Sequence, residues 1–310
     1  MRTKRAPVAV AAPARGEAAV AVRGLRKTYR ARHGGTATTA VDGLDLEVGR
    51  GEIFAVLGPN GAGKTTTVEI LEGFRDRDAG EVSVLGEDPA RAGRAWRARI
   101  GVVQQDSRDL GELTVAEHVG ATARYYPAPR DPAEVIDAVG LAEHARKRVR
   151  VLSGGQRRRL DVALGIIGQP ELLFLDEPTT GFDPQARRSF WELVSGLRDG
   201  GTTILLTTHY LDEAAHLADR VAVINRGSVV ALGAPEELGG TEARTPRVSW
   251  LHDGERRTLR TDQPTAAVTR LRDELDVQGG EIPGLTVTRP TLEDVYLDLI
   301  GNDTTSEDPR

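Results

Sequence analysis

A glycine-rich segment that follows an apolar run constrains this chain more than any other feature. Residues 58–66 read GPNGAGKTT, and the residues just before them, Ile53–Leu57, are all apolar. This order predicts a buried strand, a tight turn and a helix that begins near Lys64. The backbone N–H groups of such a turn and the positive end of the helix dipole together attract a polyphosphate. The segment therefore predicts a phosphate-binding loop.

The residues of the loop have distinct predicted contacts. Its three glycines let the backbone approach phosphates without an intervening Cβ atom. Lys64 would reach the β- and γ-phosphates, and the Thr65 hydroxyl group would bind Mg²⁺. The loop residues expected to surround a nucleotide are Gly58, Pro59, Asn60, Gly61, Ala62, Gly63, Lys64, Thr65 and Thr66. The alternative is a strand–helix turn without a ligand, which the Lys-Thr pair disfavours.

Composition limits the possible classes of protein. With 310 residues, of which 39% are hydrophobic, the chain can bury one large core and a small second domain. Its net charge of −5 argues against a general nucleic-acid binder. Because cysteine is absent, disulfides and cysteine-bound metals are excluded. No apolar stretch approaches the ~20 residues that cross a bilayer, so we expect a soluble, intracellular protein.

Strand and helix patterns alternate from Val20 to about Gly239. The alternation predicts an α/β domain over residues 18–239, a P-loop NTPase core with a mostly parallel sheet and helices on both faces. Predicted strands are Ile53–Leu57, Glu81–Leu85, Ile100–Val103, Glu171–Leu175, Thr203–Thr207 and Val221–Ile224. From about residue 106 to 164 helical spacing replaces the strand pattern, which predicts an inserted helical subdomain.

The remaining residues form smaller predicted parts. Residues 1–17 and 301–310 are expected to be disordered or frayed tails. Residues 240–300 are expected to form a small α+β accessory domain. Its predicted elements are a hairpin of Arg247–Leu251 and Glu255–Thr261, a helix over Pro264–Leu275, a strand over Gly284–Thr288 and a final helix capped by Thr291.

Two adjacent carboxylates follow a second apolar run. Leu172–Leu175 reads as a buried strand, and Asp176, Glu177 and a proline come directly after it. In open α/β sheets, ligands bind beyond the carboxyl ends of the strands. Asp176 would then hold Mg²⁺, and Glu177 would orient and deprotonate an attacking water molecule. The alternative is a pair of acids that cap a nearby helix.

A third segment, LSGGQ, ends at Gln156 and opens a predicted helix. Ser153 and Gln156 form a capping box, which is a sufficient structural explanation for those two residues. The intervening Gly154 and Gly155 are not needed for a cap. They leave amide groups bare at a helix N-terminus, which makes a second anion site.

In this order, GPNGAGKTT, LSGGQ and LLFLDEPTTGFDP resemble the ATP-binding subunits of ABC transporters over residues 18–300. The resemblance implies that ATP and Mg²⁺ are the cofactors. It also implies a head-to-tail homodimer in which two ATP molecules are sandwiched. In that arrangement Ser153, Gly154, Gly155 and Gln156 of one copy would close over the nucleotide of the other, and Asp183 would cross the same interface.

Three more residues match the family individually. Gln105 corresponds to a glutamine that contacts Mg²⁺, although Gln104 stands where a proline is common, so either glutamine could point inward. His209 corresponds to a histidine that contacts the γ-phosphate and the attacking water. Tyr29 corresponds to an aromatic residue that stacks on adenine. The alternatives are a solvated loop glutamine, a structural histidine and a core aromatic ring.

The resemblance also implies partners. The chain would act on a separate integral membrane permease, from the cytoplasmic face of the cell membrane, without binding nucleic acid. The segment PTLEDVYL, which ends at Leu297, is similar to the tail of daunorubicin-resistance-type ATPases and indicates an exporter. The alternatives are an importer ATPase subunit, a soluble ABC ATPase that acts on ribosomes or DNA, and an inactive regulatory subunit.

Basic residues concentrate at Arg146–Arg150 and Arg157–Arg159, within the predicted helical subdomain. Attraction to the membrane partner or to anionic headgroups is one interpretation. We prefer the other, a solvated face of the subdomain.

Overall fold

The computed structural model describes residues 18–30, 36–104, 111–275 and 281–301. The chain packs as two compact units that divide between Pro235 and Glu236, four residues before the boundary that the sequence pattern predicts. Gln105, the predicted tail at 1–17 and all but the first residue of the predicted tail at 301–310 lie outside the described residues. Among the described residues, no helix is both long and apolar enough to span a membrane.

The centre of the first unit is a six-stranded sheet in the order β5-β6-β7-β3-β8-β9. Its strands are β3 (Ile53–Leu57), β5 (Ile100–Val103), β6 (Leu172–Asp176), β7 (Thr203–Thr207), β8 (Arg220–Asn225) and β9 (Ser228–Gly233). All neighbours pair in parallel except β8 and β9. Every residue of β3 is buried, as expected for a parallel strand covered on both faces. The sheet confirms the predicted fold class.

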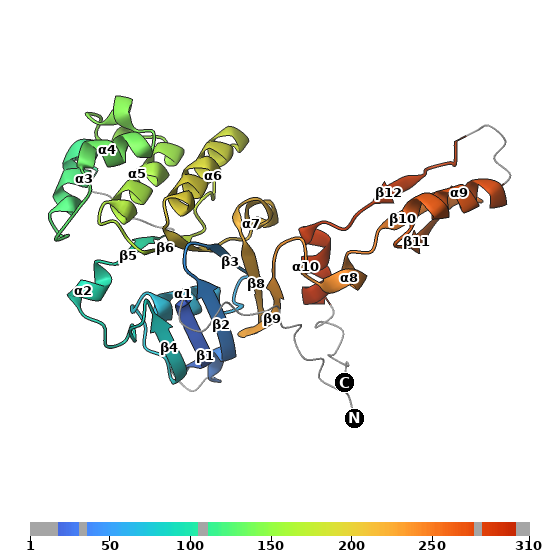
Figure 1. The fold of residues 1–310 in the computed structure, drawn as a ribbon, viewed down its shortest axis with the longest axis horizontal. Coiled ribbons are helices and arrows are strands. Elements are labelled where there is room, and N and C mark those ends of the chain that lie inside the picture. Colours follow the sequence, from blue (N-terminus) through green and yellow to red (C-terminus); the bar gives the residue numbers. More distant parts are fainter. Residues whose placement is uncertain (1–17, 31–35, 105–110, 276–280, 302–310) are drawn as a thin grey trace. The chain divides into compact units, whose positions relative to one another are not determined.

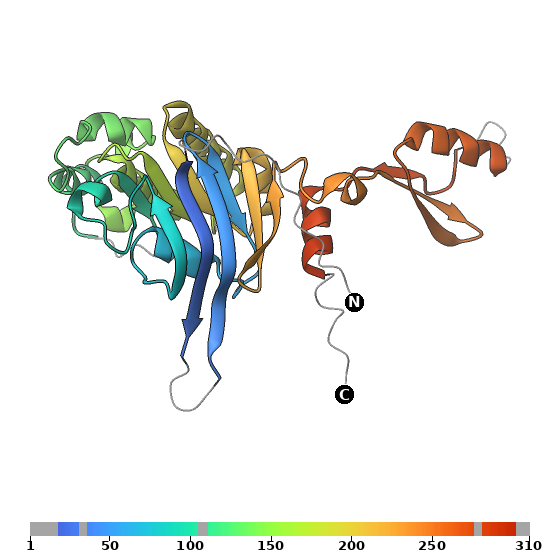
Figure 2. The same cartoon turned by 60° about the horizontal axis from the view of Figure 1, so that its bottom comes forward.

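A separate three-stranded antiparallel sheet has the order β2-β1-β4 (Figure 2). It contains β1 (Ala18–Tyr29), β2 (Thr38–Gly49) and β4 (Ala79–Val84). Placing Glu81–Leu85 in the parallel sheet was therefore wrong. The pattern of β1 and β2 escaped prediction because register shifts interrupt the alternation of buried and exposed side chains. Gly24 lies at one such shift, with a φ of 57°.

The first unit has seven α-helices among its described residues, some of which pack on the central sheet and some on other helices. They are α1 (Lys64–Leu71), α2 (Arg94–Arg97), α3 (Val115–Ala123), α4 (Pro132–Ala138), α5 (Gly154–Ile166), α6 (Pro184–Asp199) and α7 (Leu211–Leu217). In Figure 1, α3, α4 and α5 gather on one side, apart from β1, β2 and β4. Each of these three helices begins at a side-chain cap, provided by Thr114, Asp131 and Ser153.

One apolar core joins the two sheets of the first unit. It contains Val20 of β1, Phe174 of β6 and Trp96 of α2, each at most 1% exposed. The Trp96 indole N–H donates a hydrogen bond to the Val84 carbonyl at 2.8 Å, so its polar atom is satisfied in the core. The antiparallel sheet is thereby fixed against the sheet that carries the phosphate loop.

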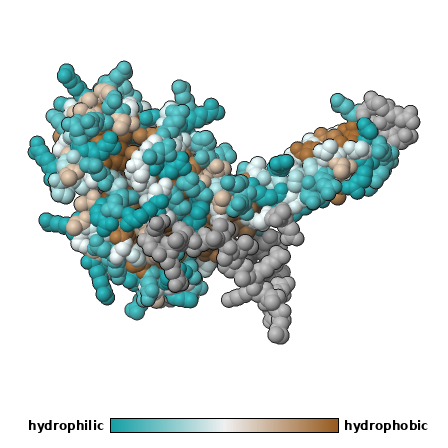
Figure 3. Space-filling view, in the orientation of Figure 1, coloured by the Kyte–Doolittle hydropathy of each residue, from teal (hydrophilic) through white to brown (hydrophobic). Residues whose placement is uncertain are grey.

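The second unit contains a three-stranded sheet in the order β11-β10-β12. Its elements are α8 (Gly240–Ala243), β10 (Arg247–His252), β11 (Glu255–Arg260), α9 (Pro264–Glu274), β12 (Thr286–Thr288) and α10 (Leu292–Gly301). A small core of Val248, Ala267, Leu271 and Ile282 joins α9 to the sheet. Figure 3 shows hydrophobic surface on this unit, where Val287 is 49% exposed.

The predicted hairpin, helix and capped final helix of this unit are confirmed, with small differences. Thr291 and Asp294 form the expected cap of α10, with the Asp294 amide donating to the Thr291 hydroxyl at 3.2 Å. The predicted strand over Gly284–Thr288 is shorter, because Gly284 adopts a positive φ of 62°. Helix α10 reaches Gly301, one residue into the predicted tail.

Two glycines allow α5 to pack directly on β5. A Cβ atom on Gly101 would lie 2.3 Å from the Gly165 carbonyl oxygen, and one on Gly165 would lie 2.9 Å from a Val103 methyl group. The first contact involves backbone and cannot be relieved by moving a side chain, and the second involves a short β-branched side chain with little freedom to move. Small residues at both positions therefore set the distance between the helical group and the sheet.

We expect Gly101→Ala to lower the free energy of unfolding by about 1–3 kcal/mol, since overpacking a close contact strains the core. Gly93→Ala is the matched control, because a Cβ atom there meets nothing within 4 Å. Urea unfolding of both variants measures the difference. Equal stability of the two variants would contradict the proposed packing constraint.

Candidate nucleotide-binding site

The phosphate loop joins β3 to α1 and is held between neighbouring backbones. A Cβ atom on Gly63, whose φ is 102°, would lie 2.2 Å from the Ala40 carbonyl oxygen of β2. A Cβ atom on Gly58 would lie 2.3 Å from the Ile224 carbonyl oxygen of β8. These positions need glycine because backbone, not a movable side chain, fills the space. The loop shape is thus fixed by both sheets.

Lys64 is the first residue of α1 and is only 7% exposed. Its ammonium group donates to the carbonyl oxygens of Gly58 at 2.8 Å and Pro59 at 3.2 Å. Burial lowers the pKa of Lys64, and the negative charges of Glu177 and Asp176 oppose that shift. The cation is therefore folded back over the loop, beside the carboxylates.

The carboxyl ends of β6 and β7 bring the acidic residues together with His209. The Thr207 hydroxyl group donates a hydrogen bond to the Asp176 carboxylate. The Glu177 amide donates to the Thr207 carbonyl at 3.0 Å, and its carboxylate oxygen lies 3.3 Å from His209 Nδ1. Glu177 adopts a positive φ of 44°, a conformation that costs a non-glycine residue about 1 kcal/mol or more. The surrounding structure therefore holds this carboxylate in a strained position.

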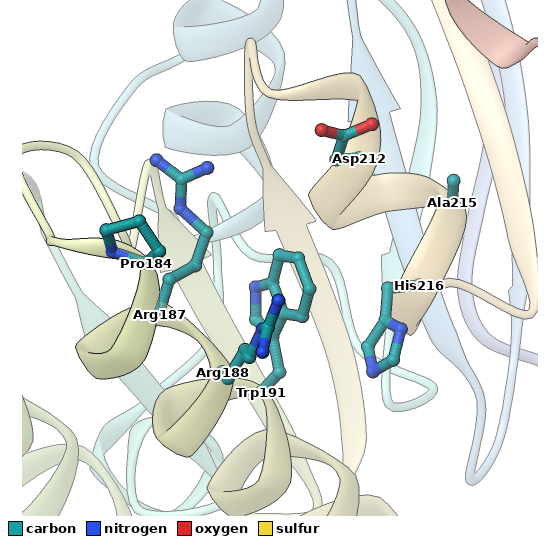
Figure 4. A pocket seen from close by; sticks show the side chains of 7 residues that line it. All are labelled: Pro184, Arg187, Arg188, Trp191, Asp212, Ala215 and His216. Carbon is teal, nitrogen blue, oxygen red and sulfur yellow. The ribbon is translucent and has the colours of Figure 1, made fainter.

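The His209 ring packs against an aromatic neighbour, which in turn contacts an arginine. Its ring lies 4.1 Å from the ring of Tyr210, and the Arg187 guanidinium group lies 4.4 Å from the Tyr210 ring centre. Figure 4 shows Arg187 on α6 at the edge of a hollow whose far wall is α7. Its lining residues are Pro184, Arg187, Arg188, Trp191, Asp212, Ala215 and His216. Through Tyr210 and Arg187, the segment that carries His209 is in contact with α6.

Tyr29 lies beside the phosphate loop. Its hydroxyl group is 3.2 Å from the Thr66 hydroxyl group, and the Arg75 guanidinium group is 5.3 Å from the ring centre. The ring is half-buried. This position is compatible with stacking on a base whose phosphates occupy the loop.

The signature segment and Asp183 make local caps. Ser153 and Gln156 form the predicted capping box of α5, with the Gln156 amide donating to the Ser153 hydroxyl at 3.2 Å. Asp183 caps α6 by accepting from the amides of Gln185 and Ala186. Within the described part of one chain, no hydrogen bond or ion pair joins either segment to residues 58–66. Both segments stay apart from the loop that they are predicted to cover.

The sequence analysis missed Arg158, which is 7% exposed. Its guanidinium group donates to three backbone carbonyls, those of Gln104, Asp176 and Pro178. One side chain on α5 therefore ties the end of β5 to the segment that carries both carboxylates. The sequence did contain a signal for the burial of Arg158. This residue lies about one helical turn before Val162, which is also buried, so both fall on the same face of α5.

The preferred interpretation of the basic residues, a solvated face, is wrong for Arg158. Its neighbour Arg159 also donates inward, to the Val139 carbonyl at 2.8 Å. Arg148 and Arg150 remain more than half exposed and both pair with Glu112. Arg158 and Arg159 are therefore structural donors, whereas Arg148 and Arg150 form surface ion pairs.

The site combines a glycine-rich loop, a lysine at the start of the following helix, and carboxylates at the ends of neighbouring parallel strands. This combination defines a P-loop nucleoside triphosphatase. The family can be stated as well. A family model described as ABC transporter matches residues 41–180. Curated relatives extend the match over nearly the whole chain, and the chain belongs to the ATP-binding subunits of the ABC transporter family. It is an ATP-hydrolysing enzyme of that family.

Two relatives and one solved structure show the extent of the likeness. The daunorubicin resistance ATP-binding protein DrrA3 of Streptomyces coeruleorubidus is 41% identical, over 93% of this chain and 97% of the relative. The Nod factor export ATP-binding protein I of Ralstonia nicotianae is 39% identical, over 92% and 94%. The cbiO1 protein of Clostridium perfringens, part of the ABC transporter complex cbiONQ, is 29% identical with a TM-score of 0.64, over 71% and 90%.

We expect Lys64→Ala to weaken ATP binding by about 10- to 100-fold, because a charge-assisted contact to the phosphates is lost. Lys147→Ala is the control, since this lysine lies in the helical group. Calorimetric titration with ATP measures both affinities. An unchanged affinity for Lys64→Ala would remove this residue from the site.

We expect Arg158→Met to lower the free energy of unfolding by about 3 kcal/mol, since it strands buried carbonyl groups. Arg159→Met, which removes a bond to one carbonyl, should cost about 1 kcal/mol. Urea unfolding compares the two. If Arg158→Met were no more destabilising than Arg159→Met, the three hydrogen bonds of Arg158 would not contribute more to the free energy of unfolding than the single bond of Arg159.

Proposed function

We propose that the chain powers an exporter by hydrolysing ATP on a separate membrane permease. The observation that supports the reaction is the contact of Glu177 with His209 at 3.3 Å, beside the Asp176 carboxylate and near Lys64. Such an arrangement provides a base, a cation and a metal-binding carboxylate at one edge of the sheet.

The residues present fit ATP and Mg²⁺. Oxygen ligands suit Mg²⁺, and Thr65 and Asp176 supply a hydroxyl and a carboxylate. The described residues hold no group of three or more acidic or histidine side chains placed to bind a metal. Mg²⁺ needs few protein ligands when phosphate oxygens and water molecules complete its coordination shell. When bound, the ion would neutralise charge on the phosphates.

Each residue then has a proposed task. Glu177 would accept a proton from the attacking water molecule, and its strained backbone would hold the carboxylate in place. His209 would orient that water and contact the γ-phosphate, supported by Tyr210 and Arg187. Lys64 would exchange its carbonyl partners for phosphate oxygens. Gln105 is proposed as a further Mg²⁺ contact, and Tyr29 as the base-stacking residue.

We further propose that two copies assemble head to tail. Gly154 and Gly155 are the first residues of α5, where a helix leaves its own amides unpaired, whereas the amides of Ser153 and Gln156 are used in the capping box. Asp183 lies at the start of α6. Among the described residues, no hydrogen bond or ion pair joins either segment to residues 58–66 of its own chain. A second copy would supply the phosphate that the bare amides of the signature segment can bind.

Transport direction and location are inferred from the relatives. Those that match over most of the chain are a daunorubicin resistance protein and a Nod factor export protein, which favours export over import. The cbiO1 protein belongs to a multi-subunit transporter complex, which supports a separate permease here. The chain would then sit peripherally on the cytoplasmic face of the cell membrane. An importer subunit is the alternative.

We expect Glu177→Gln to bind ATP, accumulate as a nucleotide-bound dimer and turn over about 10²–10⁴ times more slowly, because the general base is lost. Glu192→Gln, on the exposed surface of α6, is the control. Phosphate release and light scattering with ATP measure the two effects. Undiminished hydrolysis would exclude Glu177 as the base, and a persistently monomeric variant would exclude the ATP-dependent dimer.

A further inference from the structure

We infer that Glu213, a buried residue of α7, is a positioning residue for ATP hydrolysis. It lies where the segments that carry Glu177 and His209 meet, and it holds these two segments together. The inference rests on the proposed function, because it explains how the proposed base and its histidine neighbour are kept in place. Glu213 itself is not proposed to touch ATP.

Three parts of the first unit converge on the fully buried Glu213 side chain. From α6, the Trp191 indole N–H donates a hydrogen bond to Glu213 Oε1 at 3.3 Å. From the segment after β6, the Thr179 hydroxyl group faces the carboxylate, and from the segment after β7 the Thr208 hydroxyl group does the same. Both threonines are themselves fully buried. One carboxylate thus meets α6 and the two segments that leave the carboxyl edge of the sheet.

The two threonines lie close to the proposed reacting groups. Thr179 is two residues after Glu177. Thr208 directly precedes His209, and its hydroxyl group accepts a hydrogen bond from the Tyr210 amide at 3.0 Å, in a turn that includes the histidine. A displacement of either threonine would therefore shift one partner of the 3.3 Å contact between the Glu177 carboxylate and His209 Nδ1.

A purely structural role explains Glu213 poorly. Its Oε2 atom and the Thr179 hydroxyl group are buried, and neither has a hydrogen bond to a residue that the structure describes. Burial raises the pKa of Glu213, and the surrounding polar groups with the charge of Arg187 offset only part of that shift. An apolar side chain of similar size would avoid the cost of an incompletely paired acid. The fold keeps this costly group directly behind the site, which is where proteins retain such groups for function.

The acid faces the interior and not the neighbouring hollow. The Trp191 ring stacks on the His216 ring at 4.6 Å with 27° between their planes, and both rings line the hollow between α6 and α7 (Figure 4). Glu213 accepts the indole N–H but does not line that hollow. Its free oxygen is directed to the threonines, so the side chain is placed to link protein segments and not to bind a ligand from solvent.

The test compares variants of the full chain by their turnover at saturating ATP and by calorimetric titration with ATP. Glu213→Leu keeps a similar volume but removes the polar contacts. Its kcat should fall about 10- to 100-fold, because a small misplacement of reacting groups costs that much. Its ATP affinity should stay within about twofold of the wild type. Among the described residues, no hydrogen bond or ion pair joins Glu213 to residues 58–66.

A conservative variant and a control complete the comparison. Glu213→Gln keeps an acceptor for the Trp191 N–H and gains a donor for the threonine hydroxyl groups, so it should retain most of the turnover. Asp212→Asn, which changes an exposed acid on the same helix, should leave turnover and affinity unchanged. Urea unfolding of Glu213→Leu should show a stability equal to or above that of the wild type, since an apolar residue replaces an incompletely paired acid.

Thr179→Val keeps the test decisive if Glu213→Leu does not fold. It removes the facing hydroxyl group with little change of shape, and it should lower kcat without weakening ATP binding. If Glu213→Leu does fold, adding Thr179→Val to it should cause no further loss, because residues that act as one unit are not additive.

Wild-type turnover in a folded Glu213→Leu or in Thr179→Val overturns the inference. Glu213→Gln that is no more active than Glu213→Leu overturns it too. A loss of ATP affinity that matches the loss of turnover in Glu213→Leu would indicate a binding role and has the same consequence. These outcomes leave the proposed function intact when Glu177→Gln is inactive. Undiminished hydrolysis by Glu177→Gln instead removes the proposed base, whatever the Glu213 variants show.

Discussion

The parallel pairing of β3, β7 and β6 is the constraint on which the rest of the site depends. Thr207 of β7 aligns with Val56 of β3 on one side and with Asp176 of β6 on the other. Parallel strands end at the same edge, so this register places the phosphate loop, the two acidic residues and His209 together. A shift of one residue would turn each side chain to the opposite face and separate the carboxylates from Lys64.

The helical group is coupled to this edge by contacts of two kinds. The glycine-to-glycine approach of α5 and β5 fixes the distance between them, and Arg158 ties α5 to the backbone around Asp176. The signature segment lies at the start of the same helix. A movement of α5 would therefore displace both the backbone around the carboxylates proposed for catalysis and the surface proposed to meet a second copy.

Local patterns predicted much of the site because its chemistry is carried by contiguous segments. The phosphate loop, the Asp176–Glu177 pair and the capping box of α5 each depend on neighbours in the sequence. The antiparallel sheet was harder to predict, since β-bulges break its alternation. Arg158 was misread because a run of three arginines resembles a solvated surface, although the helical period places one of them inside.

The sequence by itself determined the family and the local features of the site: which glycine-rich loop lies between a buried strand and a helix, which carboxylates follow a buried strand and which helix begins at the signature segment. These features depend on backbone geometry over a few residues, where glycine, capping and hydrophobic period act directly. Only the tertiary structure decided that Glu177 meets His209 and that Arg158 joins three carbonyls. Those facts arise from strand order and from packing between distant segments, which no local pattern encodes.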